Sequence, residues 1–225
     1  MNDHTLKAYG NDLQAFEQVL LRMGEQVCSM LDRSTHSLLQ HDCASAQAVI
    51  DQEAGIVHIE AEIETRAIKL FALFQPVAND LRFIASAIKV SSSLSRIAEQ
   101  AVNICEQTLK HASEGPMHSA HLREITALVQ DMLRKSLQAL ATRDIALAHQ
   151  VCQQDDLVDT VYERAFNDLN AQLCKDANPT TPIVRLMLVA RYLERCADHA
   201  VNIAERTIYL INGSLPQAGT HAVEP

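Results

Sequence analysis

Two segments of this chain repeat each other, and the repeat restricts the fold more than any other feature of the sequence. Residues 94–106, LSRIAEQAVNICE, align without gaps with residues 193–205, LERCADHAVNIAE, and eight of the thirteen positions are identical. A second pair of segments, 42–57 and 144–159, aligns at a constant offset of 102 residues. The chain is therefore a tandem duplication, and both halves should fold alike.

Each half has the pattern of a helical protein. Apolar residues recur at spacings of three and four, as at Leu20, Met23, Val27, Met30 and Leu31. The chain has no Trp and only 4% aromatic residues, and few β-rich runs lie between turn signals, so a sheet is not expected. Prolines and the polar stretch 111–119 separate six expected helices, at roughly 5–40, 43–73, 77–111, 119–141, 144–176 and 181–211.

These helices divide three and three, which predicts an all-α fold of two tandem antiparallel three-helix bundles. We expect the first repeat at 1–111, the second at 118–212 and a flexible tail at 213–225. Asp42 and Asp144, at equivalent positions, are the expected N-caps of the middle helices. Helices of this length span about 40–50 Å, so the molecule should be elongated.

Charge and composition exclude several classes of function. The formal net charge is −9 and no basic stripe is present, so a nucleic-acid-binding protein is not expected. No window has the roughly 18 uninterrupted apolar residues of a membrane span. The polar start is unlike a signal peptide, and the six Cys form no CxxC pair, so we expect free thiols and a cytoplasmic location.

Acidic pairs mark the second half. Asp155 and Asp159 are four residues apart on one expected helix, and Glu194 and Asp198 are four apart on the next. This spacing places both members of a pair on one helical face. Like charges at that spacing cost about 0.2–0.5 kcal/mol on an exposed helix, and a bound cation would offset the cost. Oxygen ligands of this kind suit a divalent or iron cation, with iron, zinc, manganese and magnesium as candidates.

The first half keeps only part of this set. Its equivalent residues are Glu53, Val57, Ser95 and Glu99, so two of the four carboxylates are missing. A complete second metal site is not expected there, and Glu53 and Glu99 are weak candidate ligands. The matching apolar positions are kept because each half needs its core. The acids differ because they do something other than packing.

Two alternatives to a regulatory metal site stay open. Arg191 and Arg195 lie close to Glu194 along the chain, so the acids could form ordinary salt bridges on a solvated face. A carboxylate-bridged di-iron oxidase or metal store is the other alternative. Such bundles use an E-x-x-H motif on each of two helices, and this chain has none.

Two longer segments carry a resemblance to a known family. QPVANDLR (75–82) in the first half and LERCADHAVNIAERTIYLINGS (193–214) in the second resemble the PhoU family of phosphate-uptake regulators, and the resemblance covers nearly the whole chain. It implies two three-helix repeats, each ending in an acidic motif that binds metal in some members. Carried over to this chain, the intact motif is Glu194 and Asp198, faced by Asp155 and Asp159.

The resemblance also implies a function without catalysis. Such a protein is a cytoplasmic, usually dimeric adaptor that restrains phosphate uptake, and it contacts the ATPase side of a phosphate ABC transporter and a membrane sensor histidine kinase. An accessory protein for a non-ABC phosphate permease is the alternative. Ser95 and Glu99 depart from the family's acidic motif, which puts the first-half site in doubt. No nucleophile–base pair or Gly-rich phosphate loop predicts an enzyme.

Overall fold

The computed structural model describes residues 3–112, 120–173 and 180–215 of the 225-residue chain. Its secondary structure there is helical throughout, which confirms the all-α prediction. The elements are α1 (Asp3–Gln40), α2 (Cys43–Ile50), α3 (Glu53–Phe74), α4 (Ala78–Lys110), α5 (Ala120–Thr142), α6 (Ile145–Leu173) and α7 (Thr180–Asn212). None of these helices combines the length and the apolar character needed to cross a membrane.

The single helix predicted at 43–73 is wrong, because the structure divides it into α2 and α3 at Asp51 and Gln52. Neither residue is a Gly or a Pro. The turn is held by side chains: the Gln47 amide donates to Asp51 at 2.9 Å, and Arg33 of α1 donates to the Gln52 side-chain oxygen at 3.2 Å. The equivalent stretch of the second repeat runs unbroken through α6.

The third helix begins close to its expected position. The sequence places its start at about residue 77, and α4 begins at Ala78, with extended Val77 as its N-cap. Gln75 closes α3 in the left-handed region, at φ 48° and ψ 57°. Asp80 lies in the first turn of α4, where its charge complements the helix dipole. Parts of the expected linker and tail, residues 113–119 and 216–225, lie outside the described residues.

The duplication extends to the turns between helices. The carboxylates of Asp42 and Asp144 each accept a backbone N–H at 3.0 Å, which confirms both as N-caps. The residue before each cap is left-handed, with φ 59° at His41 and 56° at Arg143. This conformation ends the preceding helix and favours glycine, so a longer side chain there has a backbone cost.

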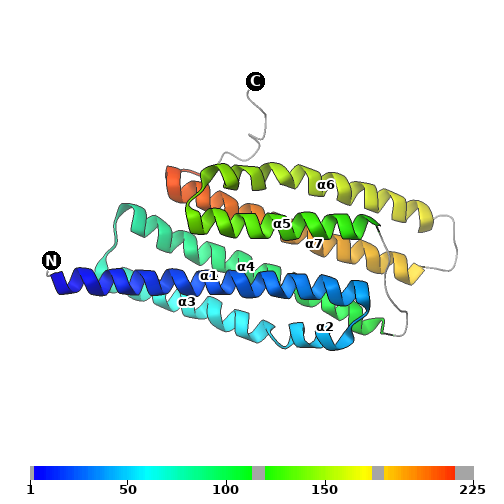
Figure 1. The fold of residues 1–225 in the computed structure, drawn as a ribbon, viewed down its shortest axis with the longest axis horizontal. Coiled ribbons are helices and arrows are strands. Elements are labelled where there is room, and N and C mark those ends of the chain that lie inside the picture. Colours follow the sequence, from blue (N-terminus) through cyan, green and yellow to red (C-terminus); the bar gives the residue numbers. More distant parts are fainter. Residues whose placement is uncertain (1–2, 113–119, 174–179, 216–225) are drawn as a thin grey trace, which may run out of the picture.

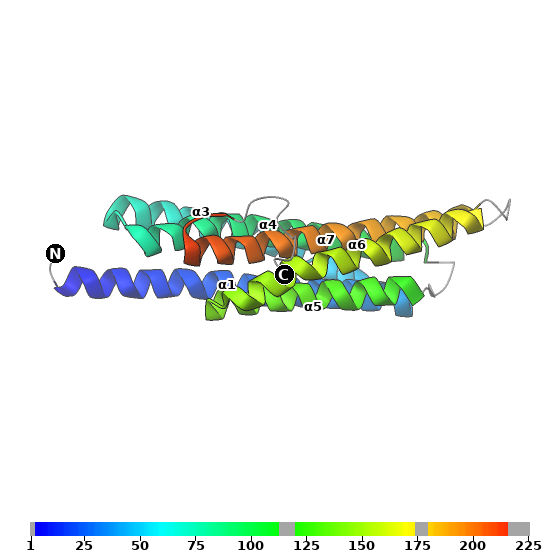
Figure 2. The same ribbon diagram turned by 90° about the horizontal axis from the view of Figure 1, so that it is seen from above.

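The seven helices run along the long axis of an elongated molecule (Figure 1). The helices of the two repeats lie side by side, and α4 packs along α7 while α1 contacts α5 (Figures 1 and 2). Repeated positions supply the core: Leu94 and Leu193 are fully buried, as are Ala101 and Ala200. Because α4 and α7 pack on each other, the two bundles share one continuous hydrophobic core.

Candidate functional site

The four carboxylates predicted in the second repeat lie together on α6 and α7; we call Asp155, Asp159, Glu194 and Asp198 the acidic face. Asp155 is half-buried, whereas Asp159 and Asp198 are exposed. The pKa of Asp155 is raised to about 6, first by burial and then by neighbouring negative charges, which include the other three members of the acidic face. The structure therefore brings the two predicted pairs within electrostatic range of each other.

Glu194 is largely enclosed by its neighbours. Only 15% of its side chain is exposed, and its Oε1 accepts from Arg191 at 2.7 Å. Its Oε2 is buried and makes no hydrogen bond to any residue in the described part of the chain. Burial, and then the charge of Asp198, raises the pKa of Glu194. Arg191 thus forms the salt bridge of the alternative interpretation, but it satisfies one of the two carboxylate oxygens.

The fit of this face to a metal ion is partial. Its donor chemistry suits a hard cation, and Oε2 of Glu194 is a carboxylate oxygen without a partner among the described residues. Yet within 3–112, 120–173 and 180–215, no three His, Cys, Asp or Glu side chains converge as they would around an ion. The side chains as they stand form an acidic surface and would have to turn toward one another to make a coordination sphere.

The first repeat has a small hollow at the place equivalent to the acidic face. Its volume is about 200 Å³, and Glu53, Val57, Ser95 and Glu99 all line it. Burial raises the pKa of Glu53, and the charge of Glu99 raises it further. Glu99 is exposed to solvent on one side and is paired with a neighbouring arginine at 2.8 Å. Glu60 also lines this hollow and was not among the predicted residues; its spacing of seven from Glu53 was the available signal.

His199 lies beside the acidic face but does not extend it. The side chain is half-buried, and burial lowers its pKa. Its charged neighbours include Asp198 and Arg195 on α7 and also Arg96 and Glu99 on α4. His199 therefore lies between the two repeats.

The QPVANDLR segment joins three parts of the fold. Tyr9 of α1 donates to the Asp80 carboxylate at 2.8 Å, and Arg82 donates to the Asn79 side chain. Arg82 also lies against Gly213 after α7, so that a Cβ on this glycine would meet its Nη1 at 3.0 Å. The sequence predicted a helix start here but not this meeting, because the partners are far apart along the chain.

Known proteins match the chain along nearly its full length. The family model described as the PhoU domain matches twice, at residues 20–108 and 122–207, which correspond to the two repeats. The phosphate-specific transport system accessory protein PhoU homolog of Clostridium acetobutylicum is 34% identical over 213 residues, covering 93% of this chain and 96% of that protein. The protein of the same name from Caulobacter vibrioides is 35% identical, with coverage of 95% and 94%.

Solved structures agree with these sequence matches. The crystal structure of PhoU from Pseudomonas aeruginosa superposes with a TM-score of 0.88 at 32% identity, covering 92% of this chain and 100% of that one. The phosphate transport system regulatory protein PhoU from Streptococcus pneumoniae superposes with a TM-score of 0.86 at 26% identity, with coverage of 93% and 99%. Since both repeats and the helical arrangement match, this chain belongs to the PhoU family.

Proposed function

We propose that this protein is an accessory regulator of a phosphate-specific transport system that lowers phosphate uptake and phosphate-starvation signalling. The observation that carries this proposal is the full-length match of both repeats to relatives named as accessory proteins of such systems. It would act in the cytoplasm by contacting the ATPase side of a phosphate ABC transporter and a sensor histidine kinase, as a homodimer.

Its action would be binding and not catalysis. The long helices offer extended outer faces, and several large apolar side chains on them are exposed, including Leu157 and Phe166 on α6. Exposed faces of this kind suit contacts with partner helices or loops. The protein would reach the membrane only through its partners.

A second part of the proposal concerns the acidic face. Carboxylates whose pKa values are raised by burial and mutual repulsion are stabilised by a nearby cation, and the buried Oε2 of Glu194 has a free lone pair for one. We infer that Asp155, Asp159, Glu194 and Asp198 would hold a divalent or iron cation, which would neutralise the face and stiffen the second repeat. Glu53 and Glu99 would at most bind such an ion weakly.

The proposed regulation is tested in cells that lack their own PhoU-family protein. The chain is expressed at native level, and uptake of radiolabelled phosphate is measured together with a phosphate-starvation reporter. We expect phosphate uptake and reporter activity to fall to the levels of the parent strain. If folded protein is present and neither phosphate uptake nor reporter activity changes, the protein does not have the proposed regulatory role.

A further inference from the structure

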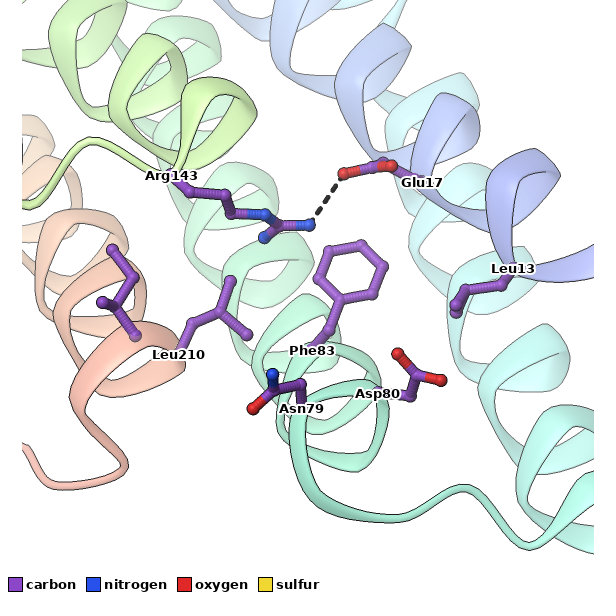
Figure 3. A pocket seen from close by; sticks show the side chains of 8 residues that line it. Leu13, Glu17, Asn79, Asp80, Phe83, Arg143 and Leu210 are labelled. Atoms are coloured by element: carbon purple, nitrogen blue, oxygen red, sulfur yellow. Dashed lines mark hydrogen bonds and ion pairs between the residues drawn. The ribbon is translucent and has the colours of Figure 1, made fainter. Parts of the chain in front are cut away.

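A cavity of about 370 Å³ lies at the end of the molecule where the two repeats meet; we call it the end cavity. Its apolar wall comes from three helices that are distant in sequence (Figure 3). Leu13 belongs to α1, Phe83 to α4, and Leu210 and Ile211 to the last turn of α7. The other four lining residues are polar or charged, and a concave site of this size that combines apolar walls with convergent polar groups is typical of binding pockets.

Arg143 forms the polar side of the end cavity. Its Nη2 donates to Glu17 of α1 at 2.8 Å, and its guanidinium lies 4.5 Å from the centre of the Phe83 ring. Its Nη1 is buried and makes no hydrogen bond to any residue of the described chain. Burial lowers the pKa of Arg143, because enclosure disfavours its charged form. A buried guanidinium nitrogen without a partner is expensive, so an acceptor from outside would stabilise it.

The backbone conformation of Arg143 also carries a steric cost. Its φ of 56° belongs to the left-handed region, where glycine carries no steric cost. The equivalent residue of the first repeat, His41, has the same conformation and uses its ring nitrogen to bond the Ala112 carbonyl at 2.6 Å. Both repeats therefore keep a polar side chain at a left-handed position. In each repeat one nitrogen of that side chain, Nδ1 of His41 and Nη1 of Arg143, is buried and has no hydrogen-bond partner in the described part of the chain.

The polar groups of the end cavity indicate what could bind there. Donors are the Arg143 Nη1 and the Asn79 amide, which both point into the space beside Leu210 in Figure 3. Acceptors are the carboxylates of Glu17 and Asp80. A peptide group presents one acceptor and one donor, so it matches this set. Two carboxylates against one guanidinium disfavour an anionic ligand.

Exposed apolar side chains occur in the wall of the end cavity and next to its α4 residues in the sequence. Ile211 in the wall is 38% exposed, and Val77 and Leu81, close in sequence to Asn79 and Asp80, are 76% and 45% exposed. An exposed apolar wall residue is typical of a protein contact rather than of a closed site for a small molecule. The α3–α4 turn, the α5–α6 turn and the end of α7 all lie at this same end of the molecule (Figures 1 and 2).

The geometry points to the end cavity as the docking site for an extended polypeptide segment of a partner, with an apolar anchor side chain in the cavity and neutral or basic neighbours. The anchor would fill the space between Leu13, Phe83 and Leu210, and its peptide carbonyl would accept from Arg143 Nη1. The inference rests on the proposed function, since the partner to be tested is the phosphate ABC transporter.

The test measures binding of the full chain to that transporter, purified with its ATPase subunits in nanodiscs. Ile211→Trp fills the end cavity from its exposed rim, and Arg143→Gly removes the guanidinium at a backbone position that suits glycine. Leu188→Trp is the matched control, because Leu188 lies on the same helix at 40% exposure and about 35 Å away along α7. Thermal unfolding checks that each variant is folded.

We expect both cavity variants to raise the Kd for the transporter by about tenfold or more and Leu188→Trp to leave it within about twofold. Absence of binding by the unchanged chain would overturn the proposed transporter contact, and this inference with it. Unchanged binding by folded cavity variants would overturn the inference alone. A change in oligomeric mass with Ile211→Trp, without a change in transporter binding, would assign the cavity to a second copy of the chain and also overturn it.

Cross-linking tests the chemistry of the docked segment. A photoreactive phenylalanine analogue at Leu81, which is exposed and next in sequence to the cavity residue Asp80, is activated in the complex, and the cross-linked transporter peptide is sequenced by mass spectrometry. The expected peptide has an apolar residue with neutral or basic neighbours. A peptide rich in Asp and Glu, or cross-linking to residues 216–225 of the chain itself, would contradict the proposed occupant.

Discussion

Asp155 is the carboxylate whose acid–base chemistry the fold changes most. Its pKa rises from 3.8 to about 6, first because of burial and then because of neighbouring carboxylates. A group that binds protons more tightly when folded stabilises the folded state at low pH and loses that contribution as the pH rises. Asp155 therefore destabilises the protein above about pH 6, and its effect disappears below about pH 4.

Replacing Asp155 by Asn should remove this destabilisation. At pH 7.5 we expect the unfolding free energy to rise by about 1 kcal/mol, a value reduced because the side chain is only half-buried. The Tm would then increase by roughly 2–4 °C. At pH 4 the variant and the original chain should unfold at the same temperature. Glu163→Gln, an exposed carboxylate of the same helix, is the control, and an equal effect there would contradict the assignment.

Metal content tests the acidic face directly. The chain is purified without chelator or affinity-tag metal, incubated with iron, zinc, manganese or magnesium, and measured by elemental analysis. We expect the original chain and Glu99→Ala to retain metal and Glu194→Ala/Asp198→Ala to lose it, because only the second repeat keeps four carboxylates. Absence of metal from every sample would leave Glu194 as a salt-bridge partner of Arg191.

The sequence predicted which residues lie on the same face of one helix. It did not predict which residues from distant segments contact each other. The i, i+4 spacing placed each acidic pair on one face, and the two pairs do lie together. The distances between their oxygens depend on rotamers and on Arg191, which spacing does not determine. Arg143 and Glu17 are 126 positions apart, so no local pattern indicated that they pair.

At the scale of the helix, local chemistry predicted the caps but not the break between α2 and α3. Asp42 and Asp144 cap their helices through their own side chains, and a sequence reveals this. The break at Asp51 and Gln52 depends partly on Arg33, which comes from another helix. Tertiary contacts of this kind override local helix propensity.

Two glycines near helix ends should respond in opposite ways to alanine. Gly55 is in the first turn of α3, and a Cβ there would have nothing within 4 Å, so Gly55→Ala should stabilise the protein by about 0.5–1 kcal/mol. Gly213 has φ 77°, and a Cβ would lie 3.0 Å from Arg82, so Gly213→Ala should destabilise it by about 1 kcal/mol. Thermal unfolding of both variants checks this. The same sign of change in both would contradict the account.

The whole molecule is a duplication whose halves share a core. The predicted all-α fold with two repeats is confirmed, and the structure shows in addition that α4 packs along α7. The repeated apolar positions, such as Ala98 and Ala197, are buried in this shared core, which explains why they are kept when the acids differ. A half by itself would expose the face of α4 or α7 that the other half covers.

Separate halves should therefore not fold as the full chain does. Fragments 1–112 and 118–225, expressed alone, are expected to unfold without a sharp cooperative transition and to bind a hydrophobic dye, because the shared core is exposed. Mixing them should restore cooperative unfolding. If either fragment alone unfolds cooperatively near the temperature of the full chain, the shared core does not hold the repeats together.

If the chain regulates phosphate transport by binding to the transporter, its effect should appear in a system reconstituted from purified components. The phosphate ABC transporter is placed in proteoliposomes with its substrate-binding protein, ATP and labelled phosphate, and the chain is titrated from the ATPase side. The account predicts a saturable fall in the initial rate of phosphate transport. A rate that does not change at any concentration of folded protein would contradict it.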